Sequence, residues 1–167
     1  TLMIEPITTI NINDPLGYPY GEFPITDSCE RSAKIMGEDY VRLVFNSTER
    51  VTFKAFSWIV YDDHTFFLPE QYIPTPNGTK EIVGGVEAMY YSYDVKFVSV
   101  ANMLSKHVCY RHVRVDSQEW YEPEININGN LETLYVIVMG AIKRIGDEYA
   151  ANQMHYGTLL QSIAANG

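Results

Sequence analysis

Residues 40–68 read YVRLVFNSTERVTFKAFSWIVYDDHTFFL, and this stretch decides the fold class. Its opening residues alternate in polarity, so Val41, Leu43 and Phe45 lie on one face of a predicted strand. Two more short strands follow, and residues 62–64 form a hairpin tip because strand-forming residues resume at once after them. A closely spaced antiparallel β meander is the economical interpretation.

The residues on the carboxyl side of this meander continue the β pattern. Prolines and glycines between residues 74 and 85 predict a loop, because proline cannot donate a hydrogen bond to a β ladder. Residues 88–100 form the longest predicted strand, and its length predicts a bulge or bend inside it. Residues 108–115 are the predicted antiparallel partner of that strand.

The pattern becomes helical after residue 126. Asn130 is a predicted N-cap and Gly146 a predicted C-cap. The predicted helix is apolar nearly all round, which favours burial on two sides, and the residues that follow it are too few to cover it. Its main apolar stripe consists of Leu131, Leu134, Tyr135, Val138, Ile142 and Ile145.

These patterns predict an α+β fold that is mainly β. A barrel-like or sandwich antiparallel domain is expected over 1–125, followed by an apolar helix. Residues 126–167 are expected to be the start of a second α/β domain that is incomplete. The chain begins with Thr1 rather than methionine, which suggests a processed or truncated product.

The amino-acid composition, and the net charge in particular, limits which classes of molecule the chain is expected to bind. The chain has 167 residues, with 21 acidic and 12 basic side chains, and a formal net charge of −9. Such a charge disfavours both nucleic acid and anionic membrane surfaces as direct partners. No apolar run reaches the roughly 18 residues needed to cross a bilayer. Cys29 and Cys109 are expected to be reduced, because a lone pair so far apart is typical neither of a disulfide scaffold nor of a zinc site.

No sequence motif points to a reaction. Glycine-rich phosphate loops, zincin helices and nucleophile elbows are absent. Consecutive hairpin residues 62–64 diverge too much to bind one metal, and His112 faces away from His107 and Cys109 on a strand. Glutamates near Trp120, at positions 119, 122 and 124, resemble a glycosidase pair, but so short a chain barely builds the cleft they need. We expect no catalytic, cofactor-binding or metal-binding residues.

The aromatic side chains leave an alternative open. The chain contains 13 tyrosines besides Trp58 and Trp120. Such rings suit a carbohydrate-binding β module that stacks on sugars, and they suit a protein interface equally well. A small enzyme with an unrecognised site is a third hypothesis.

Several segments together resemble a known family. They read SCER at 28–31, KIMGEDYVRLVF at 34–45, VTFKAFSWIVY at 51–61, LPEQYIP at 68–74 and MYYSYDVKF at 89–97, followed by the apolar helix. The chain from about residue 25 to 146 thereby resembles the amino-terminal part of the tail hub (tail-associated, tail-tip) proteins of long-tailed bacteriophages and prophages, especially those of gut Bacteroidetes. These matches are packing and turn patterns rather than chemical signatures.

The resemblance implies a structural role in a virion. Hub proteins of this type form trimeric rings at the tail tip or baseplate. Their partners are the distal tail protein and the end of the tube or tape-measure protein. It implies no catalytic residue, because enzymatic parts of such proteins lie in later domains. Ring assembly requires surfaces that neighbours cover, and the expected interface residues are Tyr90, Tyr91, Tyr93, Leu131, Leu134, Tyr135 and Val138.

Overall fold

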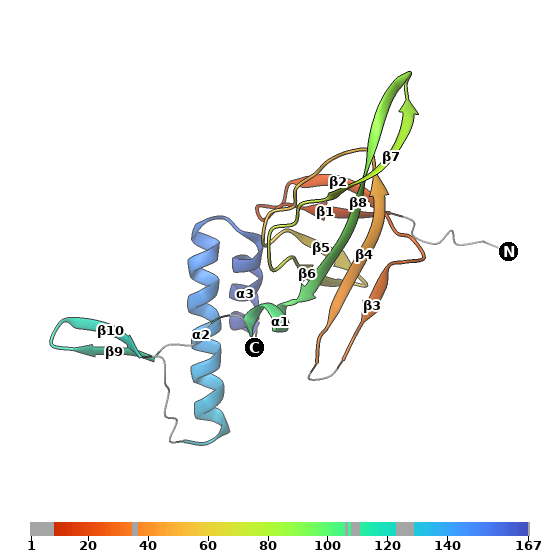
Figure 1. Ribbon diagram of the computed structural model, residues 1–167. Helices are drawn as coiled ribbons and strands as arrows, with labels where there is room; N and C mark the ends of the chain where they lie inside the picture. Colours follow the sequence, from red (N-terminus) through yellow and green to blue (C-terminus); the bar gives the residue numbers. More distant parts are fainter. Residues whose placement is uncertain (1–8, 35–36, 106, 108–110, 123–128, 167) are drawn as a thin grey trace. The chain divides into compact units, whose positions relative to one another are not determined.

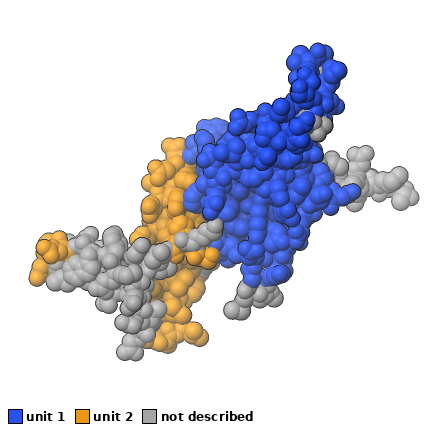
Figure 2. All heavy atoms as spheres, in the orientation of Figure 1, with its two compact units in different colours: residues 1–103 blue, residues 104–167 orange. Residues whose placement is uncertain are grey.

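The computed structural model describes residues 9–34, 37–105, 107, 111–122 and 129–166, and it gives the backbone alone for residues 79, 83, 111–115 and 119–122. The fold is α+β and mainly β, as predicted. The chain divides into two compact units, residues 1–103 (unit 1) and 104–167 (unit 2), shown in Figure 2. This division falls earlier than the predicted boundary at residue 125, because the strands after residue 104 group with the helices.

Unit 1 is an antiparallel sheet of eight strands (Figure 1). The order of the strands is β2-β1-β5-β6-β8-β4-β3, and β7 pairs with β8 outside this path. A short helix, α1 (Val100–Leu104), follows the last strand directly. The strands are β1 (Thr9–Asn13), β2 (Pro19–Pro24), β3 (Glu30–Ser32), β4 (Tyr40–Ser47), β5 (Trp58–Tyr61), β6 (His64–Phe67), β7 (Thr75–Val83) and β8 (Val86–Ser99).

Strand β8 connects the rest of the sheet. One of its edges pairs with β4 over Tyr91–Val98, and the other pairs with β7 and, further along, with β6. No register shift interrupts the β4–β8 ladder, so the bulge predicted in residues 88–100 lies instead in β7, between Pro76 and Lys80. The partner predicted at 108–115 is also wrong, because its described residues, Arg111–Val115, pair with β10 rather than with β8; residues 108–110 lie outside the described part of the chain.

The core of unit 1 follows the alternation that residues 40–45 predict. Val41, Leu43 and Phe45 of β4 are buried, and they face inward together with Tyr93 and Val95 of β8. The ring of Tyr93 stacks on Phe45, with centroids 4.6 Å apart and planes at 9°. Edge-to-face and offset contacts of this kind add stability beyond the apolar area that they bury.

Two-residue turns with positive φ connect the two strands of each hairpin. Asp62 and Asp63 have φ of 50° and 58°, and Gly84 and Gly85 have φ of 59° and 81°. Such turns match the right-handed twist of the strands that they join. The predicted tip at residues 62–64 is therefore confirmed as the β5–β6 connection, except that His64 already belongs to β6.

The prediction of a loop over residues 74–85 is wrong. The structure has a strand there, β7, which forms a hairpin with β8 that projects beyond the sheet (Figure 1). Proline is tolerated because β7 is an edge strand, and the ladder is interrupted between Pro76 and Lys80, where Gly78 has a φ of 75°. The proline and glycine content alone predicted a loop, whereas the structure has an irregular edge strand at these residues.

Unit 2 contains a hairpin and two helices. Strands β9 (Arg111–Val115) and β10 (Gln118–Glu122) pair antiparallel through a positive-φ turn at Asp116 and Ser117. Helix α2 (Leu131–Ala151) is followed by α3 (His155–Asn166). Asn130 caps α2 as predicted, since its side chain accepts a hydrogen bond from the Thr133 backbone at 3.0 Å.

Gly146 does not end the helix as predicted. It is a buried residue inside α2, and α3 packs against it. A Cβ atom on Gly146 would lie 2.9 Å from the Gln161 backbone nitrogen, and one on Gly157 would overlap the backbone of Ala150. The glycine therefore serves helix–helix packing, and α2 continues for another turn to Ala151.

This contact predicts that Gly157→Ala disrupts the α2–α3 packing. The added methyl group meets backbone rather than a flexible side chain, so we expect a loss of about 1–3 kcal/mol in the free energy of unfolding of unit 2. Urea unfolding monitored by circular dichroism measures it. Gly140→Ala is the matched control, because nothing lies within 4 Å of its Cβ, and a gain of up to about 1 kcal/mol is expected there. Equal effects of the two substitutions would contradict the close contact.

A second prediction concerns the hydroxyl of Tyr93. It donates to the Glu49 carbonyl at 2.6 Å and accepts from the Val51 backbone at 2.8 Å. Tyr93→Phe keeps the ring but removes both hydrogen bonds, so a loss of about 1–3 kcal/mol is expected in thermal or urea unfolding. Tyr90→Phe, which removes an exposed contact with Glu81, should change stability by less than about 0.5 kcal/mol. An equally small effect at Tyr93 would refute the prediction.

Candidate interaction surfaces

The structure separates the seven predicted interface residues into three environments. Tyr93 is 1% exposed and belongs to the core, so its ring is not available to a partner, and this part of the prediction is corrected. Tyr90 and Tyr91 are half-buried on β8. The α2 residues Leu131, Leu134, Tyr135 and Val138 are all exposed.

The exposed α2 residues belong to a part of the helix that extends beyond its neighbour. Helix α2 has 21 residues and α3 has 12, so they span about 31 and 18 Å at the usual rise per residue. Because α3 runs back from residue 155 and Gln161 lies beside Gly146, α3 can cover only the carboxyl half of α2. We call residues 131–139 the projecting segment of α2; it is the lower part of the helix in Figure 1.

The projecting segment is apolar on several sides. Its sequence is LETLYVIVM, with Glu132 as the one charged residue. Leu131 is 83% exposed and Val136 is 64% exposed. A helix that is apolar nearly all round is typically buried against other protein or in a membrane. None of the helices that the structure describes is both long and apolar enough to cross a membrane.

Unit 1 carries a second exposed apolar region on the β7–β8 hairpin, which projects beyond the sheet (Figure 1). Ile82 is 76% exposed and Val86 is 68% exposed. Lys80 and Glu87 form an ion pair of 3.2 Å across the same hairpin. Isolated two-stranded hairpins are only marginally stable in water, so the outer part of this hairpin gains little from the core of unit 1.

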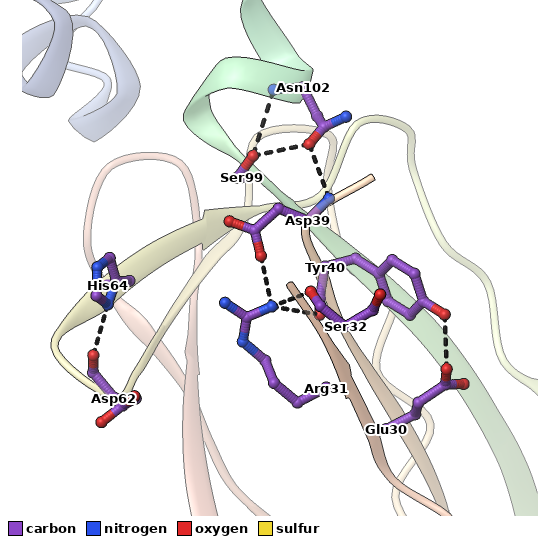
Figure 3. Close-up of polar contacts among 9 residues, drawn as sticks. All are labelled: Glu30, Arg31, Ser32, Asp39, Tyr40, Asp62, His64, Ser99 and Asn102. Carbon is purple, nitrogen blue, oxygen red and sulfur yellow. Dashed lines mark hydrogen bonds and ion pairs between the residues drawn. The ribbon is translucent and has the colours of Figure 1, made fainter. Parts of the chain in front are cut away.

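The outer face of β3, β4 and β8, by contrast, is strongly polar. Arg42 donates to both carboxylate oxygens of Asp94 at 2.7 Å, and this pair lowers the pKa of Asp94. The Tyr40 hydroxyl donates to Glu30 at 2.7 Å (Figure 3), which raises the pKa of Tyr40. Lys96 lies 4.3 Å from the centre of the Tyr40 ring. This face suits solvent better than an apolar partner.

Unit 1 also has a cleft of about 910 Å³ beside β1 and β5. Beyond the projecting surfaces, it is the feature that sequence reasoning missed. No local sequence pattern could have predicted the cleft, because it depends on the number of residues over which β1 and β5, which are distant in sequence, pair with each other. It is lined by Thr9, Ile10, Asn11, Asn13, Ile25, Arg31, Val60, Tyr61 and Asp62.

Arg31 closes one side of this cleft in a fixed orientation. Its guanidinium donates to Asp39 and to the carbonyls of Ser32 and Tyr40 (Figure 3). It also lies 4.8 Å from the centre of the Phe66 ring. Its charge is thus already balanced within the protein.

The residues weighed for chemistry do not come together among the described parts of the chain. His64 contacts the Asp62 carbonyl at 2.6 Å within its own turn. No group of three His, Cys, Asp or Glu side chains suited to a metal occurs among the described residues. Cys29 is a free thiol, as expected, and it is half-buried. Outside the described side chains lie Cys109, His112, Glu119, Trp120, Glu122 and Glu124.

The carbohydrate hypothesis gains no support from Trp58. The ring is half-buried, and it lies 3.9 Å from the position of a Cβ on Gly17. A sugar platform needs an open aromatic face. The rings that could contribute to a platform are therefore exposed tyrosines such as Tyr18, which is 69% exposed.

In unit 2, His107 packs with two tyrosines. Its Nε2 lies 3.1 Å from the Tyr156 hydroxyl, and its ring stacks on Tyr156 and meets Tyr149 edge to face. Burial lowers the pKa of His107, and the nearby Glu148 carboxylate opposes this shift. Burial also lowers the pKa of His155.

Comparison with known proteins identifies no relative of this chain: no family model, curated protein or solved structure matches it. The surfaces described above are therefore the features of this chain that bear on its function.

The two histidines predict that acid destabilises unit 2. The unfolded chain binds protons at about pH 6.5, where the folded unit does not, so stability is complete above that pH and falls as the pH drops toward the folded pKa values. Urea midpoints at about pH 7.5 and about pH 5.5 measure the change. His107→Gln should reduce the difference between the two midpoints. His64→Gln, at the exposed start of β6 in unit 1, should leave it unchanged. An unaltered difference in His107→Gln would contradict the assignment.

Proposed function

We propose that this chain is a structural component of a bacteriophage or prophage tail, the first domain of a tail hub protein together with the start of the next. The resemblance over residues 25–146 supports this role. The projecting segment of α2 is the observation that carries it, because an assembly protein needs a surface that a neighbouring subunit covers.

The spacing of the exposed residues favours association through the helix. Leu131, Leu134 and Val138 recur at intervals of three and four, the arrangement by which helices pack side by side. Covering the exposed parts of these side chains removes apolar surface from water, and this favours association between subunits. The resemblance favours a trimer.

The proposal extends to location and partners. The chain would act in the virion tail, after assembly in the host bacterial cytoplasm, with the distal tail protein and the tube or tape-measure end as neighbours. The formal charge of −9 favours protein partners over nucleic acid and anionic membranes. In this role the chain needs no cofactor and catalyses no reaction.

Sedimentation velocity at micromolar concentration tests the proposal. The wild-type chain should sediment as a trimer, and Leu134→Glu or Val138→Glu should give monomers, because each places a charge in the covered surface. Leu16→Glu is the matched control, since this leucine is 50% exposed in the β1–β2 turn of unit 1 and should leave the trimer intact.

Two results would contradict the proposal. One is a wild-type chain that remains monomeric at every concentration. The other is a trimer that persists in both α2 variants, which would remove the projecting segment from the interface. A monomer that binds specific sugars on a glycan array would favour the carbohydrate-binding alternative.

A further inference from the structure

The cleft in unit 1 exists because two neighbouring strands stop pairing. β1 and β5 form a single backbone pair, Asn13↔Trp58, although β1 pairs with β2 along its whole length. The Asn13 side chain reaches the Trp58 carbonyl at 3.5 Å and closes this end of the gap. Beyond that point the two strands form no further backbone pair.

Most of the residues that line the cleft are those that a continued ladder would have joined; Ile25 and Arg31 come from the segment that includes β3. Counting back from Asn13↔Trp58, Asn11 would face Val60 and Thr9 would face Asp62, and all four line the cleft. The facing edges of β1 and β5 therefore carry backbone groups without a strand partner among the described residues. Such groups form strong hydrogen bonds with another extended backbone.

The side chains of the cleft combine apolar and polar character. Ile10, Ile25 and Val60 provide apolar contacts, and Asn11 and Thr9 provide polar ones. A volume of about 910 Å³ is within the range of sites that bind ligands. Alternation of this kind along two strand edges matches a partner whose own side chains alternate.

The charge of the cleft is set by Asp62. Arg31 is compensated by Asp39, as Figure 3 shows, whereas the Asp62 carboxylate is exposed at the β5–β6 turn. A lysine or arginine on the partner would complement it.

We propose that the β1–β5 cleft binds an extended polypeptide segment that adds a strand between these edges and places a basic side chain near Asp62. Backbone hydrogen bonds would supply affinity and the lining side chains specificity, as in other cases of strand addition. This inference is independent of the proposed helix-mediated assembly, because it concerns a surface of unit 1 alone.

Selection of random peptides displayed on phage, with the full chain as bait, provides the probe. We expect the selected peptides to alternate apolar and polar residues and to contain Lys or Arg. Synthetic copies should protect the amides of residues 9–13 and 58–61 from hydrogen exchange. Methylation of alternate backbone nitrogens in the peptide should abolish binding, because it removes the donors that strand addition uses.

Matched variants separate the cleft from the rest of the surface. Val60→Arg should abolish binding by filling the cleft, whereas Val86→Arg, on an exposed valine of the projecting hairpin, should not. Asp62→Asn should weaken the binding of basic peptides by about two- to fivefold. Asp63→Asn removes the same charge from the neighbouring turn position and should have a smaller effect.

Three results would overturn the proposal. They are the failure to select any peptide, equal binding by Val60→Arg and wild type, and full binding by the N-methylated peptide. Each is distinguishable from failure of the assembly proposal, since Val60→Arg should sediment like the wild-type chain.

Discussion

The sheet unit depends on one strand that is bonded along both edges. β8 pairs with β4 on one side and with β6 and β7 on the other, and its inward residues Tyr93, Val95 and Phe97 are essentially fully buried. A one-residue shift of this strand would turn all three outward and place Asp94 and Lys96 in the core. The buried face and the charged outer face together fix the register. The Arg42–Asp94 pair on the outer face is specific to the same alignment.

Local patterns predicted much of this fold. Alternation located β4, a long run of strand-forming residues located β8, the Asp62–Asp63 turn located a hairpin, and Asn130 located the start of α2. The failures have a common cause in contacts between distant residues. Gly146 looks like a helix terminus in sequence, and its role as a contact point for α3 depends on Gly157. Pro76 indicated a loop, but an edge strand with an interrupted ladder accepts it.

The candidate surfaces were likewise predictable only where a local sequence pattern determines them. The apolar character of α2 was evident in its sequence, and the exposed side chains of the projecting segment agree with it. Tyr93 was misassigned because a tyrosine ring suits a core and an interface equally well, and only the buried partners of its hydroxyl decide between them. The cleft could not be predicted at all, since it arises where β1 and β5 separate and no residue type specifies that separation.

The hairpin turns have a consequence for the order of folding. Neighbouring strands joined by two residues can pair within microseconds, so β5–β6, β7–β8 and β9–β10 are accessible to the chain early. The β4–β8 ladder must instead close across a long intervening segment, since Arg42 and Asp94 lie 52 positions apart. Long-range pairing of this type limits folding rates. Until it forms, β8 has an unpaired edge and an uncovered apolar face, which favours aggregation of the newly made chain in that interval.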